Sequence, residues 1–312
     1  MGKRIAFLGP LGTFGWRVVT KDHPDATLYP CLSHAEVIQE VIEGEADLGY
    51  VARENSLGGT VVDTVDPFLR NPVGIAMHLQ EGSVISLRGD LVVCGETVLP
   101  IEQCLYGHNN DREVTRVYSH QQALSQCRKF LSIRFPRAEL VPADSTVGGV
   151  ARLREDPCGV AIAPPWAGEF YPDIPLLEKA IQDFPVNDTR FLIVGREECV
   201  PSGTDKTSLW FTVPEDEKPG TFDHVSQILA LANINKRSIE TRPMQTELGK
   251  YIFLIEVDGH CRDRIIELAL ELIVLAGHTT KLTILGSYPR WQQANGKQKE
   301  EVSHNGSTVY GS

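Results

Sequence analysis

A hydroxyl and a guanidinium stand side by side at Thr189-Arg190, in the segment Asn187-Asp188-Thr189-Arg190-Phe191 that follows Asp183. A weak neutral acid of this kind can protonate a leaving group while the neighbouring cation holds an anionic substrate. A Thr-Arg pair ahead of an apolar run is also typical of a strand edge with a solvated charge, so its weight depends on the other segments. The pair directs attention to reactions in which an anion loses a leaving group.

Two loops with candidate ligand-binding groups follow predicted strands. Gly9-Pro10-Leu11-Gly12-Thr13-Phe14 comes directly after the apolar run 5–8, where free N–H groups at the start of a helix can bind a carboxylate. Glu54-Asn55-Ser56 follows the apolar run 48–51, at the sheet edge where α/β proteins bind ligands, and an Asn amide both donates and accepts hydrogen bonds. Taken singly, the first loop is also typical of a tight turn and the second of a helix cap or Asx turn.

Hydroxyl and amide side chains also mark the start of two later predicted helices. Tyr118-Ser119-His120 leads into a predicted helix over 121–131 that carries Gln126, and Ser145-Thr146 opens another helix. Ser119 and Gln126 are candidate hydrogen-bond donors to a substrate. Helix capping explains the Ser145-Thr146 pair better than catalysis does.

The composition favours a globular protein that binds small metabolites. A chain of 312 residues has room for about two domains, and 42% hydrophobic with 7% aromatic content is ordinary. The net charge of −11 argues against a nucleic-acid or anionic-membrane surface, so we expect neither kind of partner. An anionic ligand must then be held by local Arg, Lys and backbone N–H groups.

The cysteines and histidines predict neither a metal site nor a disulfide framework. The seven cysteines are odd in number and lack Cys-x-x-Cys spacing, which indicates a reducing, cytoplasmic compartment. The nine histidines contain no His-x-x-x-His motif. The apolar run 5–8 is too short for a secretory core, and the run 265–275 is far short of the ~20 residues that span a bilayer.

Apolar runs alternate with amphipathic stretches up to the polar segment 197–205, which predicts an α/β fold followed by a domain boundary. Strands are expected at 5–8, 46–51, 84–93 and 159–163. Between residues 207 and 285 the pattern predicts the order βαββαβ, the ferredoxin-like arrangement with helices on one face of an antiparallel sheet. The polar segment 291–312 lacks periodicity and is expected to be disordered.

In this order the segments resemble the prephenate dehydratase family with its C-terminal ACT domain, from about Lys3 to about Arg290. The motifs that carry the resemblance are Gly9-Pro10-x-Gly12-Thr13-Phe14, Glu54-Asn55-Ser56 with Gly59 and Val61, Gly95-Glu96, Ser119-His120 with Gln122 and Gln126-Cys127, Ser145-Thr146, Asp183, Asn187 with Thr189-Arg190-Phe191, Lys206-Thr207-Ser208, Pro219-Gly220, 239–243 and 285–289. The resemblance implies a catalytic domain over 1–198 with two α/β lobes, like a type II periplasmic binding protein, a ferredoxin-like ACT domain over 204–290, and a tail over 291–312.

The same resemblance implies an enzyme that converts prephenate to phenylpyruvate, water and carbon dioxide in phenylalanine biosynthesis. Aromatisation drives this step, so the protein need only bind the dianion, orient it and protonate the departing hydroxyl, without a metal, nucleophile or redox cofactor. By family analogy Thr189 is the hydrogen-bond donor or general acid, and Asn55, Gln126 and Ser119 are the other catalytic residues, which position the substrate. Further substrate-binding candidates are Arg190, Thr13, Ser56, Ser145, Thr146, Phe191 and Arg53, with Arg190 either holding a carboxylate or serving the structure.

Regulation by phenylalanine is implied for the C-terminal part. In the family this effector binds at ACT interfaces of a homo-oligomer, here a dimer or tetramer. The expected effector-binding residues are Pro219, Gly220, Phe222, Glu240, Thr241 and Arg242. Phe222 has the size to fill an effector pocket, and Thr241 stands where the family usually has Ser.

Four departures from the family pattern fall on segments that are expected to line or support the site. Ala52-Arg53 replaces the usual Pro-Ile and brings a cation beside the expected pocket; the others are Gly15-Trp16, Val147-Gly148-Gly149-Val150 and Pro164. They are either neutral drift or signs of a prephenate decarboxylase, an arogenate dehydratase or a non-catalytic amino-acid sensor. Thr189 argues against the decarboxylase, and its combination with Asn55 and Gln126 argues against the sensor. Arogenate, which differs from prephenate by an amine, stays open.

Overall fold

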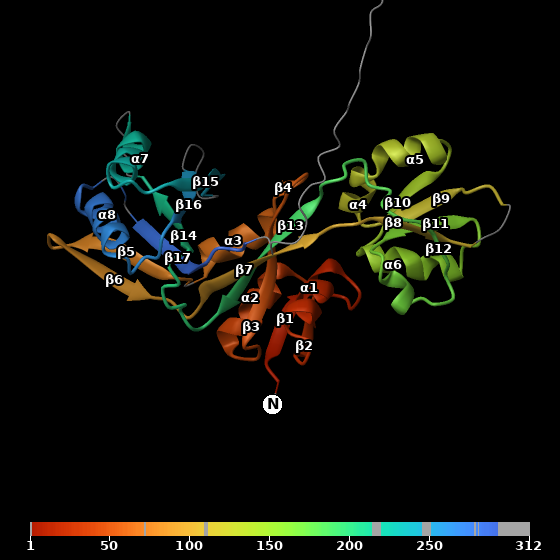
Figure 1. The fold of residues 1–312 in the computed structure, drawn as a ribbon, viewed down its shortest axis with the longest axis horizontal. Coiled ribbons are helices and arrows are strands. Elements are labelled where there is room, and N and C mark those ends of the chain that lie inside the picture. Colours follow the sequence, from red (N-terminus) through yellow and green to blue (C-terminus); the bar gives the residue numbers. More distant parts are fainter. Residues whose placement is uncertain are drawn as a thin grey trace, which may run out of the picture.

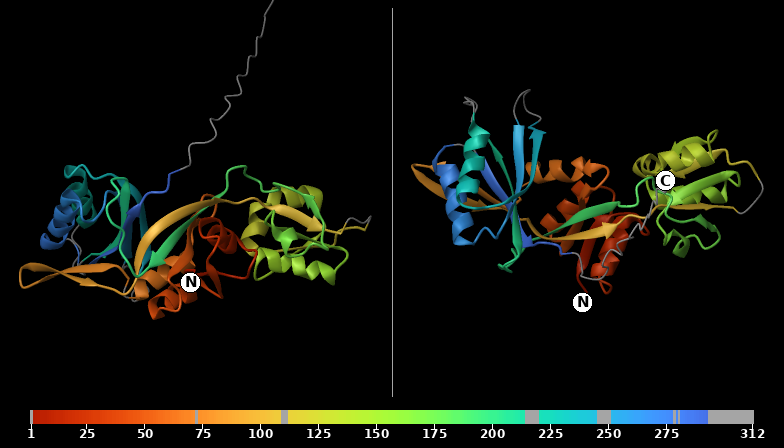
Figure 2. Two further views of the ribbon diagram at one scale, coloured as in Figure 1. Left: turned by 60° about the horizontal axis from the view of Figure 1, so that its bottom comes forward. Right: turned by 45° about the horizontal axis from the view of Figure 1, so that its top comes forward.

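The computed structural model describes residues 2–71, 73–108, 112–213, 220–244, 251–277, 279 and 281–292. These residues form three β-sheets with flanking helices (Figures 1 and 2). Residues 4–70, red and orange in Figure 1, lie in the middle, with the second sheet at one end and the blue C-terminal elements, beside the orange strands of residues 75–88, at the other. The predicted α/β class is confirmed. Within these ranges, no helix is both long and apolar enough to cross a membrane.

The first lobe consists of the first sheet and the three helices packed on it. The strand order is β2-β1-β3-β13-β7, with β1 parallel to β2 and β3 and with β13 antiparallel to both of its neighbours. The elements are β1 (Arg4–Leu8), α1 (Phe14–Asp22), β2 (Thr27–Cys31), α2 (His34–Glu43), β3 (Leu48–Asn55), β4 (Gly59–Thr60), α3 (Val62–Arg70), β7 (Val92–Pro100) and β13 (Asp188–Gly195).

Strand β3 contains a β-bulge at Arg53. Its partner β13 pairs Arg190 with Glu54 and the next residue with Ala52, so Arg53 has no residue opposite. Side chains alternate between the two faces of a strand, and one extra residue reverses the alternation beyond it. Ala52 before the bulge and Asn55 after it therefore reach the same cavity.

The second lobe consists of the second sheet and its helices. The strand order is β10-β9-β11-β8-β12. The chain enters this lobe after β7 and returns to β13, so two segments, 101–103 and 179–187, connect the lobes. The elements are β8 (Cys104–Gly107), β9 (Arg116–Ser119), α4 (Gln121–Gln126), α5 (Arg128–Arg134), β10 (Glu139–Pro142), α6 (Thr146–Ala151), η1 (Arg152–Arg154), β11 (Gly159–Ala163), η2 (Ala167–Glu169) and β12 (Leu176–Glu178).

The helix predicted over 121–131 is two helices, α4 and α5, separated at Cys127. The Asp183 carboxylate accepts hydrogen bonds from the backbone N–H groups of Lys129 and Phe130, at 2.9 and 3.2 Å. A carboxylate that satisfies N–H groups of the first turn starts a new helix, because those groups no longer bond within the preceding one. The apolar periodicity continues across the break, which is why the sequence predicted one helix.

The third sheet contains the βαββαβ order expected for the C-terminal part. Its strands are arranged β15-β16-β14-β17, all antiparallel, and α7 and α8 pack on one face over a shared apolar core. The elements are β14 (Asp205–Thr212), α7 (Thr221–Leu231), β15 (Lys236–Pro243), β16 (Tyr251–Asp258), α8 (Arg264–Leu275) and β17 (Lys281–Pro289). The tail prediction over 291–312 lies outside the described residues, apart from 291 and 292.

A hairpin from the N-terminal part of the chain extends the third sheet. Strands β5 (Ile75–Gln80) and β6 (Ser83–Arg88) pair with each other, and β5 pairs with β17, with Met77 opposite Leu282. Glu81 and Gly82 both have positive φ, as the tight two-residue turns of hairpins require. The extended conformation predicted over 84–93 is confirmed for 84–88 and 92–93, but these two parts belong to different sheets as β6 and β7.

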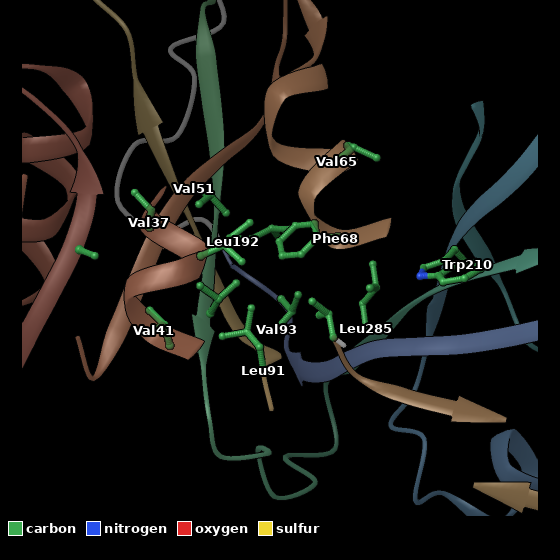
Figure 3. Close-up of a cluster of buried hydrophobic side chains, with 14 of the residues drawn as sticks. Val37, Val41, Val51, Val65, Phe68, Leu91, Val93, Leu192, Trp210 and Leu285 are labelled. Carbon is green, nitrogen blue, oxygen red and sulfur yellow. The ribbon is translucent and has the colours of Figure 1, made fainter. Parts of the chain in front are cut away.

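The first lobe and the third sheet share one apolar core. Phe68 of α3 and Val93 of β7 face Trp210 and Leu285 of the third sheet, on the side opposite to α7 and α8 (Figure 3). The backbones of β7 and β17 approach so closely that any side chain at Gly286 would collide with the Val93 carbonyl group. The C-terminal sheet is thus attached to the first lobe along a buried surface.

Candidate active site

A cavity of about 290 Å³ opens between the first lobe and the helices of the second lobe. The ends of β1, β3 and β13 and the starts of α1, α2 and α3 line one side, and α4 and the start of α6 line the other. This edge of the sheet is where open α/β folds bind ligands. Among the predicted site residues, those that line the cavity are Thr13, Asn55, Gln126, Ser145, Thr146, Thr189 and Phe191.

The start of each first-lobe helix contributes to the cavity wall. Thr13 caps α1 by accepting the Trp16 backbone N–H at 3.3 Å, and Ser33 caps α2 by accepting that of Glu36 at 3.1 Å. Unpaired N–H groups give helix N-termini a partial positive charge that attracts anions. No Arg or Lys lines the cavity in the described part of the chain, so anion binding there depends on neutral donors and helix ends.

The Thr189 hydroxyl is oriented by Asn55, its partner across the strand pair. Asn55 Nδ2 donates to Thr189 Oγ1 at 3.0 Å, and the Asn55 carbonyl oxygen accepts the backbone N–H groups of Leu57 and Gly58 at 3.0 and 2.9 Å. The two backbone donors fix which end of the amide faces Thr189. Since no acceptor among the described residues takes the Thr189 proton, the hydroxyl can donate it to a ligand.

Gln126 belongs to the same set of neutral groups. Its Oε1 accepts from Gln103 Nε2 at 3.0 Å and from Asn187 Nδ2 at 3.1 Å, and Asn55 Nδ2 donates to Asn187 Oδ1 at 2.8 Å. We call Asn55, Gln103, Gln126 and Asn187 with Thr189 the amide cluster. Gln103 lies on the linker between the lobes, and no sequence motif pointed to it.

His34 is a second cavity residue that sequence reasoning missed. It is the first residue of α2, and its side chain is buried. Burial lowers the pKa of His34 to about 4, while the Asp63 carboxylate opposes this shift. The imidazole is therefore neutral near pH 7. Only its place directly after the Ser33 cap marks it in the sequence.

Residues 5–199 match the family model described as prephenate dehydratase. The chain belongs to the prephenate dehydratase family. The match covers both lobes, including every element that contributes to the cavity.

Relatives agree with this placement over nearly the whole chain. A bifunctional chorismate mutase/prephenate dehydratase of Stutzerimonas stutzeri is 36% identical, covering 92% of this chain and 73% of the relative. The structure of prephenate dehydratase from Arthrobacter aurescens in complex with L-Phe has a TM-score of 0.75 and 31% identity, covering 92% and 90% of the two chains. The structure of GqqA, described as a novel type of quorum quenching acylase, has a TM-score of 0.72 and 26% identity, covering 92% and 97%. The mixed α/β fold thus matches prephenate dehydratase structures, and relatives over nearly the full length of the chain support prephenate dehydratase activity.

Four residues expected in the prephenate dehydratase site lie outside the cavity, and two of them are serines. Ser119 is fully buried, and its hydroxyl donates to the Ile162 carbonyl oxygen at 2.7 Å. Ser56 is exposed, and its hydroxyl accepts the Asp188 backbone N–H at 2.9 Å. Both connect neighbouring segments around the site, so their direct contact with a substrate is not supported.

Arg190 points to the face of β13 opposite to Thr189, because side chains alternate along a strand. Its guanidinium lies 2.8 Å from Glu256, 3.0 Å from Glu54 and 3.2 Å from Glu96. Lys206 lies 2.6 Å from Glu96 and 3.1 Å from Glu256. We call these five residues the ionic cluster. Of the two roles predicted for Arg190, the structural one is supported.

The ionic cluster connects the prephenate dehydratase lobe to the third sheet, since Lys206 lies on β14 and Glu256 on β16. Burial alone would raise the pKa of the Glu256 carboxyl, but Arg190 and Lys206 outweigh it and hold that pKa below its usual value. The Glu256 carboxylate therefore stays ionised and paired.

Arg53 also points away from the cavity, and its expected place beside the pocket is corrected. From the bulge in β3 it donates to Glu240 Oε2 at 2.8 Å, and Thr60 Oγ1 donates to the same oxygen at 2.9 Å. Arg242, two residues further along β15, pairs with Asp66 of α3 at 3.2 Å. Two of the expected effector residues, Glu240 and Arg242, thus contact the first lobe.

The other expected effector residues lie elsewhere on the third sheet. Gly220 has a positive φ of 93° at the start of α7, and Phe222 stacks on Phe253 with ring centroids 5.0 Å apart. Thr241 is exposed on β15, on the face opposite to Glu240. Pro219 lies outside the described residues.

The departure at Gly15-Trp16 has a structural role between the lobes. The Trp16 ring meets Phe170 of the second lobe edge-on at 5.1 Å, and Phe14 meets Trp166 at 5.4 Å. Trp166 Nε1 also donates to the Gly12 carbonyl oxygen at 2.8 Å. These contacts hold the two lobes together beside the cavity.

Proposed function

We propose that this chain is a prephenate dehydratase, which converts prephenate to phenylpyruvate with loss of water and carbon dioxide. Family membership and the relatives' activities support the reaction. The observation that carries it is the Thr189 hydroxyl, which accepts a hydrogen bond from Asn55 and keeps its own proton for a ligand in the cavity. That arrangement suits a group that donates to a departing hydroxyl.

The reaction requires no covalent bond between the protein and the substrate. The bond between the ring and its carboxylate breaks and its electron pair enters the ring, while the ring C–O bond breaks and the departing oxygen takes a proton to become water. A threonine hydroxyl is a poor acid, so we expect about 10²-fold from proton transfer and more from hydrogen bonding to the developing charge. Thr189 then regains a proton from solvent.

The dianionic substrate is held by neutral donors. The N-termini of α1 and α2 and the hydroxyls of Ser145 and Thr146 surround the cavity, and the amide cluster lies at its wall. Helix ends and hydroxyls bind carboxylates without requiring a buried cation. Aromatic contacts at Phe191 complete the site.

The domain assignment follows the family. We assign residues 1–198 to a two-lobed catalytic domain like a type II periplasmic binding protein, with the cavity between the lobes, and 204–290 to an ACT domain. The hairpin β5–β6 belongs to the catalytic domain in sequence and to the ACT sheet in space. The linkers 101–103 and 179–187 serve as the hinge between the lobes.

Phenylalanine is the proposed effector, and the supporting fact is the L-Phe complex of the Arthrobacter aurescens relative. Gly220, Phe222 and Thr241 are its proposed contacts in a cytoplasmic homo-oligomer, a dimer or tetramer. Glu240 and Arg242 connect that region to the first lobe through Arg53 and Asp66. Saturating phenylalanine should raise the unfolding temperature and inhibit turnover; the absence of both effects counts against regulation.

The decisive experiment incubates the purified chain with prephenate and identifies the products by mass and ultraviolet spectra, against the uncatalysed reaction. Phenylpyruvate supports the proposal. A non-aromatic product that retains the hydroxyl indicates a decarboxylase, and no turnover refutes dehydration of prephenate. The same assay with arogenate tests the amino-acid form of the substrate.

A further inference from the structure

Six polar side-chain atoms within the described ranges are buried without a hydrogen-bond partner, and two of them belong to residues that line the cavity. One is Gln103 Oε1, but the amide group of Gln103 is already anchored to Gln126 in the amide cluster. The other is Nδ1 of His34, whose side chain contributes to the cavity wall from the first position of α2. His34 is 6% exposed.

His260 provides a comparison, because it is a buried histidine with a structural role. His260 is 1% exposed, and both of its ring nitrogens are satisfied. Nε2 lies 3.1 Å from the Cys199 carbonyl oxygen, and Nδ1 accepts the Arg262 backbone N–H at 3.1 Å. Burying a polar nitrogen without a replacement bond costs folding free energy. His34 retains this cost in a side chain that lines the cavity.

We propose that His34 is a further substrate-contact residue, whose neutral imidazole hydrogen-bonds a carboxylate or carbonyl oxygen of the substrate. The inference rests on the proposed dehydratase function, which supplies the substrate. A neutral ring offers one N–H donor and no positive charge. This suits a dianion in a cavity whose described lining contains neither Arg nor Lys, because every oxygen of the ligand then needs a neutral donor.

The test compares His34→Phe with His260→Phe. Phenylalanine keeps a flat ring at position 34 and removes both nitrogens. We expect KM for prephenate to rise about 10-fold with kcat within about threefold, and the unfolding temperature to stay equal or rise because the unpaired nitrogen is gone. The control His260→Phe should lower the unfolding temperature and leave KM within about twofold, because it removes two satisfied bonds away from the cavity.

Two amide variants identify the nitrogen that acts. His34→Asn places an amide near the Nδ1 position and His34→Gln places one near Nε2, so one of these two variants should have a KM closer to the wild-type value than that of His34→Phe. The inference is overturned if the wild type converts prephenate while His34→Phe keeps KM within about twofold, or if KM rises and neither amide recovers any of it. Failure of the wild type to convert prephenate overturns the proposed function, and this inference with it.

Discussion

Two polar clusters, buried apart from Glu54, lie on opposite faces of strand β13, and neighbouring residues of that strand belong to each. Thr189 joins the amide cluster at the cavity, and Arg190 joins the ionic cluster against the third sheet. The amide cluster keeps the Thr189 proton and one carbonyl oxygen of Gln103 unused within the described chain. In the ionic cluster each carboxylate has at least one cationic partner.

The two clusters therefore suit different functions, one the binding of a ligand and the other the permanent attachment of two parts of the molecule. Neutral groups with spare donors and acceptors can exchange partners with a ligand at small cost, because no charge is left uncompensated. A buried ion pair that loses one member leaves a charge in a medium of low polarity, so it resists exchange. The first arrangement suits a site, and the second suits a permanent attachment between the first lobe and the third sheet.

The largest expected effect comes from removing Arg190. Arg190→Met leaves Glu96 and Glu256 with Lys206 as their one cation in the described cluster, and we expect the free energy of unfolding to fall by about 4 kcal/mol. Chemical denaturation measures it. Arg154→Met, which breaks an exposed pair with Asp173, is the control and should leave the free energy of unfolding nearly unchanged. Equal effects of the two variants would contradict the distinction.

Thr189→Ala tests the amide cluster on the other face of β13. We expect kcat for prephenate to fall about 10²- to 10³-fold, with KM within about threefold and little loss of stability, because the hydroxyl acts on the departing oxygen. Thr189→Ser, which keeps the hydroxyl, should retain most of the activity. Equal losses in kcat and binding, or no loss, would refute the role of this residue in the chemistry.

A pH titration of stability tests the neutral state of His34. Its pKa is about 4 in the folded protein and 6.5 in an unfolded chain, so the unfolded state binds the proton first as the pH falls. We expect protonation of His34 to lower the free energy of unfolding by up to roughly 3 kcal/mol as the pH falls from 6.5 to 4. Above pH 6.5 this residue should not change the stability. His34→Phe should abolish that part of the pH dependence. Superimposable wild-type and variant profiles would show that the ring is not buried as described.

The smallest expected effect tests the corrected position of Arg53. Arg53→Ile restores the residue usual in the family and leaves the partly exposed Glu240 carboxylate with Thr60 as its remaining donor in the described structure. Because the pair is largely buried, we expect the free energy of unfolding to fall by about 2 kcal/mol. The ratio kcat/KM should stay within about threefold, because Arg53 does not reach the cavity. A large change in KM would instead support the cation beside the pocket that the sequence suggested.

The motifs predicted the residues that meet at the cavity better than they predicted which way charged side chains point. Asn55, Gln126 and Thr189 were all expected from motifs, and they lie in one hydrogen-bonded set. Arg53 and Arg190 were placed wrongly or ambiguously, because their directions depend on a β-bulge and on the register with β13. Such register depends on a partner strand far away in the sequence.

The other errors of the sequence-based predictions also arise from contacts between residues that are far apart in the sequence. The break between α4 and α5 depends on the Asp183 carboxylate, which arrives from a distant linker. Gln103 and His34 stand in no motif, and only the closure of two lobes around them gives them a role. The βαββαβ order of the C-terminal part was predictable, because each of its elements carries its own local periodicity.

The hairpin β5–β6 has a consequence for the order of events during synthesis. Met77 of the hairpin pairs with Leu282 of β17. Because Leu282 lies much later in the chain, the hairpin leaves the ribosome long before its neighbouring strand is synthesised. Until β17 is made, one edge of β5 has no partner strand, and an open edge invites pairing with other chains. A shortened chain that ends near the domain boundary would keep that edge permanently, and we expect it to aggregate where the whole chain does not.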